Sequence, residues 1–313
     1  MIILKKYFIV LLTCSFLFVL ISCTHKNDAY QHKADTDKAA ATTEKAEYNT
    51  FTGRKPLDKV SFEVKEHEDD KKLSTVKIEH SFGVAKNGQP HSISVESQHF
   101  FETKKFEAIT MDTQTKENIY LTFDCGYENG YTSKILDILK SKNIKAAFFC
   151  TLDQIKSEPE LIARMINEGH VVGNHSATHP SFDTLTRNQI AKELEECENY
   201  LRENFGYSSS YFRFPKGNYS EMALDTVGDL GFTSVFWSLS YADWNTEKRN
   251  GADYAFKKVT ERLHPGAIIL LHSVSPDNAE ALVNIIDYAT ENGYVFSSLE
   301  KLKLSYSNYN TEN

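Results

Sequence analysis

From about residue 117 onward, short apolar runs alternate with stretches in which apolar residues recur every three or four positions. Runs such as Ile119–Asp124 and Ala267–His272 have the length of strands, and their apolar centres suit strands buried on both faces. Stretches such as Thr132–Lys142 and Arg187–Phe205 have helical spacing, and the second is followed by a glycine. The pattern therefore predicts repeated β-α units.

The remaining predicted elements continue this alternation. We expect further strands over residues 145–151, 170–173, 211–214, 233–238 and 294–297. We expect further helices over residues 158–168, 220–230, 252–263 and 278–292. Repeated β-α units imply a parallel sheet, and this many units in one span favour a barrel, with an open doubly wound sheet as the alternative.

The first residues predict an export signal, because two lysines precede an apolar run that is short for a membrane span. The Leu-Ile-Ser-Cys ending at Cys23 resembles a bacterial lipobox, in which the cysteine is lipidated and becomes the new N-terminus. We therefore expect residues 1–22 to be a lipoprotein signal peptide and the protein to be extracytoplasmic, lipid-anchored to the cell membrane. An ordinary signal peptide and an uncleaved anchor are the alternatives.

Composition divides the rest of the chain into three parts. Residues 23–50 contain few large apolar residues, so we expect a disordered tether. Residues 51–116 are expected to form an N-terminal extension, whose turn-rich stretch Ser81–Pro90 packs irregularly on the main domain. Residues 117–305 are expected to form that main domain.

The charge balance argues against one class of partner. The formal charge is −8, and removing residues 1–22, which contain two lysines and no acidic residue, changes it to −10. An acidic chain has no electrostatic basis for binding nucleic acid or an anionic membrane surface. We therefore expect no nucleic-acid partner, and membrane attachment only through the lipid anchor.

Cysteine usage does not indicate a disulfide scaffold. Cys14 and Cys23 belong to the export segment, which leaves Cys125, Cys150 and Cys197, an odd number without close metal-type spacing. Cys125 and Cys150 each fall near the end of a predicted strand, so a disulfide between them is one alternative. Because disulfide geometry is demanding, we expect free thiols.

Ionisable side chains stand where predicted strands end. Asp124 follows an apolar strand and precedes a sharp turn at Gly126, and His272 directly follows the apolar run Ile268–Leu271. Sites in α/β folds assemble at such strand ends, so a carboxylate and an imidazole there are candidates for a general base and a general acid. Asp124 alone could instead cap a helix, whereas His272 is harder to explain as a solvent-facing residue.

Two histidines and an arginine complete the candidate chemistry. His175 and His179 are four residues apart and can reach one metal ion from a loop or a single helical turn. The alternative is a pair of exposed loop histidines. Arg213 lies between apolar runs, and a buried arginine needs an anionic partner, for which Asp124 is the natural candidate. Together these residues suggest a metal hydrolase with a separate acid and base.

Five motifs, in this order along the chain, resemble those of the NodB-type polysaccharide deacetylases, also called carbohydrate esterase family four. They are Thr122–Cys125, His175–His179, Arg213–Gly217, Asp243–Trp244 and Leu270–His272. They are similar to the family's T-F-D-D, H-[ST]-x-x-H, R-x-P-x-G, D-W and L-x-H motifs. The resemblance covers roughly residues 117–300 and implies an irregular (β/α) barrel with fewer than eight strands, the NodB homology domain.

The resemblance implies an acid and a base, each with a supporting residue. Asp124 would be the general base that takes a proton from the attacking water, and His272 would be the general acid that protonates the departing amine. Arg213 would tether Asp124, and Asp243 would orient His272. Asp243 in isolation could equally cap a helix.

The resemblance also implies a metal site and a substrate pocket. His175 and His179 would bind a divalent ion, most plausibly zinc. The backbone N–H of Lys216 would hold the oxyanion, while Trp244 and Leu270 would line a small apolar pocket for the acetyl methyl.

One position departs from the family pattern. Most relatives carry a metal-binding aspartate where this chain has Cys125. The thiol could supply a soft ligand, point away from the metal, or be a neutral spacer. We therefore include Cys125 among the metal ligands only as an alternative.

Within the family, the chain looks most like the muramic-acid deacetylases that make the δ-lactam of spore cortex peptidoglycan. The stretches Thr122–Thr132, Ser273–Ala281 and Ser81–Pro90 carry this similarity. We therefore expect metal-dependent N-deacetylation of N-acetylmuramic acid in peptidoglycan glycan strands by a membrane-tethered lipoprotein. One alternative is deacetylation of N-acetylglucosamine or another polysaccharide. The other is a non-catalytic wall-binding lipoprotein whose metal site failed at Cys125.

The lipobox hypothesis predicts that Cys23→Ala abolishes membrane association, because the variant has no thiol to acylate. Fractionation of cells that express each form, followed by immunoblotting, measures this. A variant that stays in the membrane fraction as fully as the unmodified chain would favour an uncleaved anchor.

Overall fold

The computed structural model describes residues 48–64 and 72–302. The predicted signal peptide, Cys23 and most of the predicted tether lie outside these residues. The described residues belong to one compact unit that begins at Lys45. Of the helices in this described part, none is long and apolar enough to cross a membrane.

Ten strands and eight α-helices make up the described part of the chain. The strands are β1 (Ile78–Glu79), β2 (Ala108–Ile109), β3 (Asn118–Cys125), β4 (Ala147–Cys150), β5 (Val171–Asn174), β6 (Tyr211–Phe212), β7 (Asn218–Tyr219), β8 (Thr233–Val235), β9 (Ile268–His272) and β10 (Val295–Phe296). The helices are α1 (Ser92–Lys104), α2 (Thr132–Ser141), α3 (Leu152–Ser157), α4 (Pro159–Asn167), α5 (Arg187–Phe205), α6 (Glu221–Asp229), α7 (Ala252–Thr260) and α8 (Pro276–Glu291).

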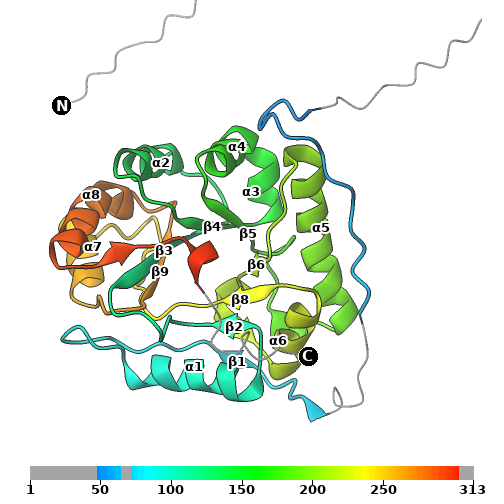
Figure 1. Ribbon diagram of the computed structural model, residues 1–313, viewed down its shortest axis with the longest axis horizontal. Coiled ribbons are helices and arrows are strands. Elements are labelled where there is room, and N and C mark those ends of the chain that lie inside the picture. Colours follow the sequence, from blue (N-terminus) through cyan, green and yellow to red (C-terminus); the bar gives the residue numbers. More distant parts are fainter. Residues whose placement is uncertain (1–47, 65–71, 303–313) are drawn as a thin grey trace, which may run out of the picture. The chain divides into compact units, whose positions relative to one another are not determined.

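The main sheet is parallel and curls into a half-barrel flanked by helices (Figure 1). Seven strands follow one another in the order β10-β3-β4-β5-β6-β8-β2, and β9 pairs with β3 beside this row. Isolated bridges join Met111 to Ala267 and Leu239 to Ile269, so residues that follow β2 and β8 approach β9. The curled row of seven strands confirms the predicted irregular (β/α) barrel with fewer than eight strands, rather than the open doubly wound sheet.

The strand register brings the chemistry together at one edge of the sheet. Asp124 is directly opposite His272 in the β3–β9 pair, and Asn174, which precedes His175, is opposite Cys150 and Phe212 on its two sides. Because neighbouring strands are parallel, their carboxyl ends meet at the same edge.

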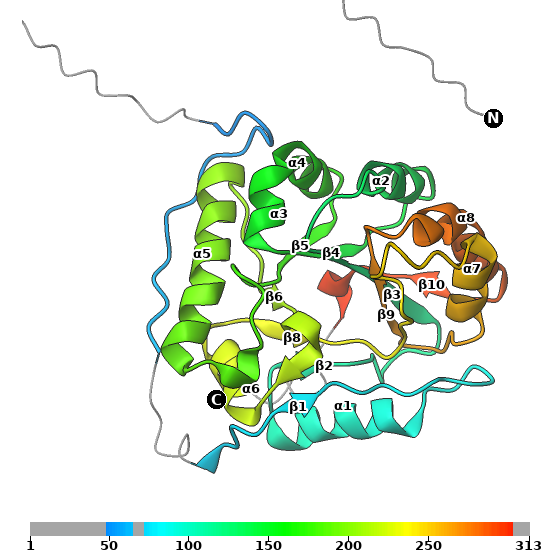
Figure 2. The same ribbon diagram turned by 180° about the vertical axis from the view of Figure 1, so that it is seen from behind.

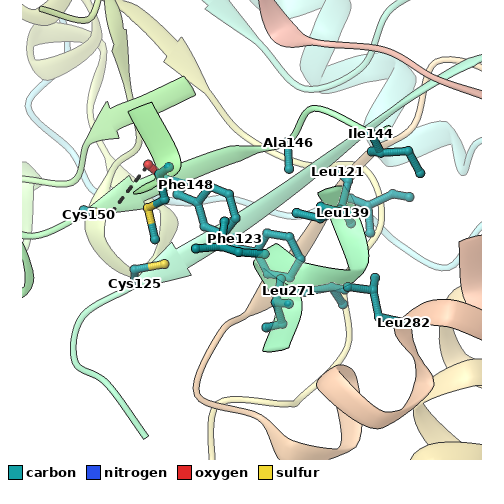
Figure 3. Close-up of a cluster of buried hydrophobic side chains, with 14 of the residues drawn as sticks. Leu121, Phe123, Cys125, Leu139, Ile144, Ala146, Phe148, Cys150, Leu271 and Leu282 are labelled. Carbon is teal, nitrogen blue, oxygen red and sulfur yellow. Dashed lines mark hydrogen bonds between the residues drawn. The ribbon is translucent and has the colours of Figure 1, made fainter. Parts of the chain in front are cut away.

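Alternation along β3 separates the site from the core. Leu121, Phe123 and Cys125 are fully or almost fully buried in the hydrophobic cluster between sheet and helices (Figure 3). Thr122 and Asp124 point to the opposite face, because successive side chains of a strand alternate. Burial of each large apolar side chain in this cluster stabilises the fold by about 1.5–3 kcal/mol.

Capping residues explain several helix boundaries. Thr186 and Gln189 form a capping box at the start of α5, and Gly206 ends that helix in the left-handed conformation, so the predicted bounds of α5 are correct. Helix α8 begins at Pro276, two residues before the predicted start, because the Ser275 side chain caps it and proline suits the first turn.

The N-terminal extension is built into this unit. Strand β1 pairs antiparallel with β7, and β2 pairs parallel with β8. Helix α1, which the sequence did not predict, lies beside β2 in both views (Figures 1 and 2). The extension therefore contributes strands and packing to the main domain.

Candidate active site

A cavity of about 1140 Å³ opens at the carboxyl ends of the strands. Asp124, His175, His179, Lys216 and His272 all line it, so residues from the predicted motifs meet in one place. They come from segments up to 148 positions apart, which the parallel register brings to one edge.

Arg213 holds Asp124 in a buried ion pair. The Arg213 side chain is fully buried, and its Nη1 donates to Asp124 Oδ1 at 2.8 Å. Its Nε donates to the Val235 carbonyl at 2.8 Å, and its guanidinium carbon lies 4.1 Å from the centre of the Phe149 ring. Burial alone would raise the pKa of Asp124, but Arg213, His175 and His272 together outweigh this effect, so that pKa lies below its usual value. The base is therefore ionised at neutral pH.

The two histidines lie side by side at the end of β5. Their ring centres are 4.9 Å apart. His175 Nδ1 donates to the Arg213 carbonyl at 2.8 Å, which directs Nε2 towards Asp124 Oδ2, 3.6 Å away. Burial lowers the pKa of His175, and burial together with His175 lowers the pKa of His179 to about 4. Both imidazoles are therefore neutral, the form that ligates metals.

This donor set fits a divalent ion, although no ready-made cluster of three or more His, Cys, Asp or Glu side chains is found in residues 48–64 and 72–302. Two neutral imidazoles can supply nitrogen ligands, and the carboxylate of Asp124 lies beside them. A backbone carbonyl already fixes the orientation of His175, as is usual for a metal-binding histidine. His175 and His179 would hold such an ion.

Cys125 is not brought together with the histidines. Its side chain is fully buried in the hydrophobic cluster and does not line the cavity (Figure 3). The Ser273 hydroxyl donates to its sulfur at 3.3 Å. The structure therefore gives no support to the sequence-based alternative in which Cys125 ligates the metal. Cys125, Cys150 and Cys197 are all free thiols, as predicted.

Asp243 and Asn278 orient His272. Asp243 Oδ1 accepts from His272 Nδ1 at 2.7 Å, and Oδ2 accepts from the backbone N–H of His272 at 2.8 Å. Asn278 Nδ2 donates to Asp243 Oδ2 at 2.5 Å and to the His272 carbonyl at 3.2 Å. Burial alone would lower the pKa of His272, but Asp243 raises it above its usual value. We did not predict a role for Asn278 from the sequence.

Lys216 occupies an unusual backbone conformation beside the cavity. It has φ of 60° and ψ of 4°, in the left-handed region that non-glycine residues rarely adopt. The turn Pro215–Gly217 that contains it is packed tightly, because a Cβ on Gly217 would lie 2.9 Å from the Trp237 ring. Such a fixed turn is suited to present a backbone N–H at one place.

The predicted acetyl pocket differs from the observed lining in one respect. Leu270 is 4% exposed and lines the cavity as expected. Trp244 also lines it but is 58% exposed, so it stands at the rim with its ring centre 6.0 Å from that of His272. Tyr127, half exposed, is a further aromatic side chain of the lining that sequence reasoning did not single out.

Comparison with known proteins agrees with this arrangement. The model of the family "Polysaccharide deacetylase" matches residues 111–235. The peptidoglycan-N-acetylmuramic acid deacetylase PdaA of Bacillus subtilis is 41% identical over 217 residues, which cover 69% of this chain and 82% of that protein. The chain belongs to the polysaccharide deacetylase family. It is therefore a deacetylase, a hydrolase of carbohydrate esterase family four, as its motifs predicted.

Two further likenesses support the assignment. The solved structure of Bacillus subtilis PdaA, described as a family 4 carbohydrate esterase, superposes with a TM-score of 0.69 and 39% identity, covering 74% of this chain and 98% of that one. A peptidoglycan-N-acetylglucosamine deacetylase of Bacillus cereus is 33% identical over 172 residues, or 55% of this chain and 62% of that protein.

The His272–Asp243 pair predicts a shift in the pH profile of this deacetylase. A general acid must be protonated, so activity falls as pH rises through the pKa of His272. In Asp243→Asn the charge that raises this pKa is lost and burial dominates. The alkaline limb of kcat/KM should therefore move to lower pH, by about 1 unit or more.

The pH dependence of acetate release measures this shift. Asp153→Asn, which removes an exposed carboxylate from the same cavity, is the control and should move the limb much less. An unchanged alkaline limb in Asp243→Asn would contradict the assignment of His272 as the general acid.

Proposed function

We propose that this deacetylase removes the acetyl group from N-acetylmuramic acid in peptidoglycan. The observation that carries the chemistry is the pairing of Asp124 and His272 in register on adjacent strands, with opposite electrostatic partners. An ionised carboxylate and a protonated imidazole on one cavity are what amide hydrolysis requires, because water must lose a proton and the amine must gain one.

Each residue has one task in the proposed reaction. Asp124 takes the proton from the attacking water, and Arg213 keeps it ionised and in place. The backbone N–H of Lys216 donates to the oxygen that becomes negative as water adds to the acetyl carbon. His272, oriented by Asp243, gives its proton to the sugar nitrogen as the C–N bond breaks, which leaves acetate and a free amine.

The proposed cofactor is a divalent ion, preferably zinc, held by His175 and His179. When bound, it would polarise the acetyl carbonyl and lower the pKa of water. Imidazole ligands suit zinc and neighbouring transition metals, whereas magnesium and calcium prefer oxygen.

The choice of muramic acid is supported by the name of one relative and by the sequence between Thr122 and Thr132. PdaA of Bacillus subtilis is named for N-acetylmuramic acid, and it is more similar to this chain than the Bacillus cereus relative named for N-acetylglucosamine. N-acetylglucosamine is therefore the second candidate substrate. We further propose that the product enters the muramic δ-lactam of spore cortex, and that lipidation at Cys23 holds the enzyme on the outer face of the cell membrane.

An assay on defined glycans tests the proposed function. Purified protein with added zinc should release acetate from peptidoglycan, and mass spectrometry of the digested glycan should place the new amine on muramic acid. A new amine on glucosamine would establish the second candidate instead. No acetate from either sugar would favour the non-catalytic wall-binding alternative.

The metal proposal predicts weaker binding when either histidine is lost. His175→Ala and His179→Ala should each bind zinc at least about tenfold more weakly and release acetate more slowly, because a single imidazole remains. Isothermal titration calorimetry of the metal-free protein with zinc measures the affinity for the ion. His99→Ala, an exposed histidine on α1, is the control. A variant with unchanged zinc affinity would remove that histidine from the site.

A further inference from the structure

We propose that the segment His80–Val84 of the N-terminal extension, called here the extension wall, is part of the glycan-binding site. Within it, Phe82 and Val84 determine how well a polymeric strand binds, by contacting the apolar face of a sugar ring. This inference rests on the proposed function in so far as the ligand is a peptidoglycan strand.

The extension wall faces the same cavity as the acid and the base. All five of its residues line that cavity together with Asp124 and His272. The segment nevertheless lies outside residues 111–235, the part of the chain that the family model matches. The segment therefore reaches the reaction site from outside the matched stretch, as His272 does.

The wall is anchored at its first residue and at its middle. The backbone N–H of His80 donates to the Gly217 carbonyl at 2.9 Å, and His80 Nε2 hydrogen-bonds the Trp237 carbonyl at 2.7 Å. In the middle of the segment, the Ser94 hydroxyl of α1 donates to the Phe82 carbonyl at 2.5 Å. A segment held in this way keeps its shape before the substrate arrives, which lowers the entropic cost of binding.

Gly83 lets the wall pack closely on α1. Its φ is 66°, and a Cβ at this position would lie 2.3 Å from the ring of His91, the residue that caps α1. Only glycine fits both the backbone conformation and this contact. The turn at Gly83 separates the two side chains of interest, Phe82 and Val84.

The surface that the wall presents is apolar. Val84 is 41% exposed, and the ring centre of the half-buried Phe82 lies 6.3 Å from those of His80 and Trp237. An exposed aliphatic side chain inside a catalytic cavity is well placed to exclude water from a ligand. Sugar rings carry C–H groups on one face, so they complement such a surface.

The size of the cavity indicates more than an acetyl site. Its volume of about 1140 Å³ exceeds the roughly 300–1,000 Å³ that pockets for drug-sized ligands occupy. The reacting acetamide fills only a small part of that space. The remainder, bounded on one side by the wall, accommodates the sugar rings of the strand.

A pair of valines in the extension gives a matched test. Val84→Thr keeps the shape but replaces a methyl by a hydroxyl, and Val84→Asp removes the apolar surface. Val95 of α1 is similarly exposed, at 45%, and is not among the residues that line the cavity. The control variants are therefore Val95→Thr and Val95→Asp.

The proposed contact between Val84 and the glycan predicts a change in KM without a change in kcat. With soluble peptidoglycan strands as substrate, KM should rise roughly threefold in Val84→Thr and roughly tenfold or more in Val84→Asp, at unchanged kcat. Hydrolysis of 4-nitrophenyl acetate, which is too small to reach the wall, should stay at the level of the unmodified enzyme. The Val95 variants should match the unmodified enzyme on both substrates.

Two results would overturn the inference. One is a KM for the Val84 variants equal to that of the Val95 variants. The other is an equal loss on strands and on the small ester, which would show damage to the site as a whole. Failure of the proposed function is distinct, because the unmodified enzyme would then release no acetate from muramic acid. The wall is tested on whichever glycan that enzyme accepts.

Discussion

The ion pair between Arg213 and Asp124 is the interaction on which the rest of the site depends. Burying a guanidinium is costly unless a carboxylate and further acceptors satisfy it, and here the Val235 and Phe236 carbonyls supply those acceptors. Loss of one partner of a buried pair costs about 3–5 kcal/mol, because the other charge is left unpaired. The pair therefore joins β3 to the residue that follows β6, and the Nε bond of Arg213 extends this link to the end of β8. The same carboxylate is the proposed base.

The site separates two titratable groups by giving them partners of opposite charge. Asp124 faces a cation and His272 faces an anion. The pKa of Asp124 is therefore lowered and that of His272 is raised. Each shift is achieved against burial, which acts on both groups in the opposite sense. The parallel register then sets the two side by side, so that acid and base share one cavity without sharing a proton.

Most of the barrel could be predicted from the sequence, because its strands and helices are long enough to show their periods. Helix α5 was predicted to the residue, since capping residues mark both of its ends. The elements of the N-terminal extension were not predicted, because β1 and β2 are two residues each and α1 has no clear apolar stripe. Short pairings of this kind are decided by tertiary contacts rather than by local pattern.

Some residues of the candidate site could likewise be predicted from the sequence, and others could not. Residues that end strands could be identified from their position, and the Arg213–Asp124 contact followed from burial alone. The orientation of Cys125 could have been inferred from alternation, since its neighbour Asp124 faces the cavity. Phe82, Val84 and Asn278 could not be found, because their significance lies in contacts with residues far away in the chain.

The anchoring of the extension has a consequence for how the protein folds. His80 emerges early during synthesis, yet its partner carbonyl at Trp237 is 157 residues further along the chain. Contacts of such long range form late, because closing a large loop is entropically costly until other contacts have shortened it. We therefore expect the wall to join the cavity only once the curled sheet has brought Trp237 within its reach.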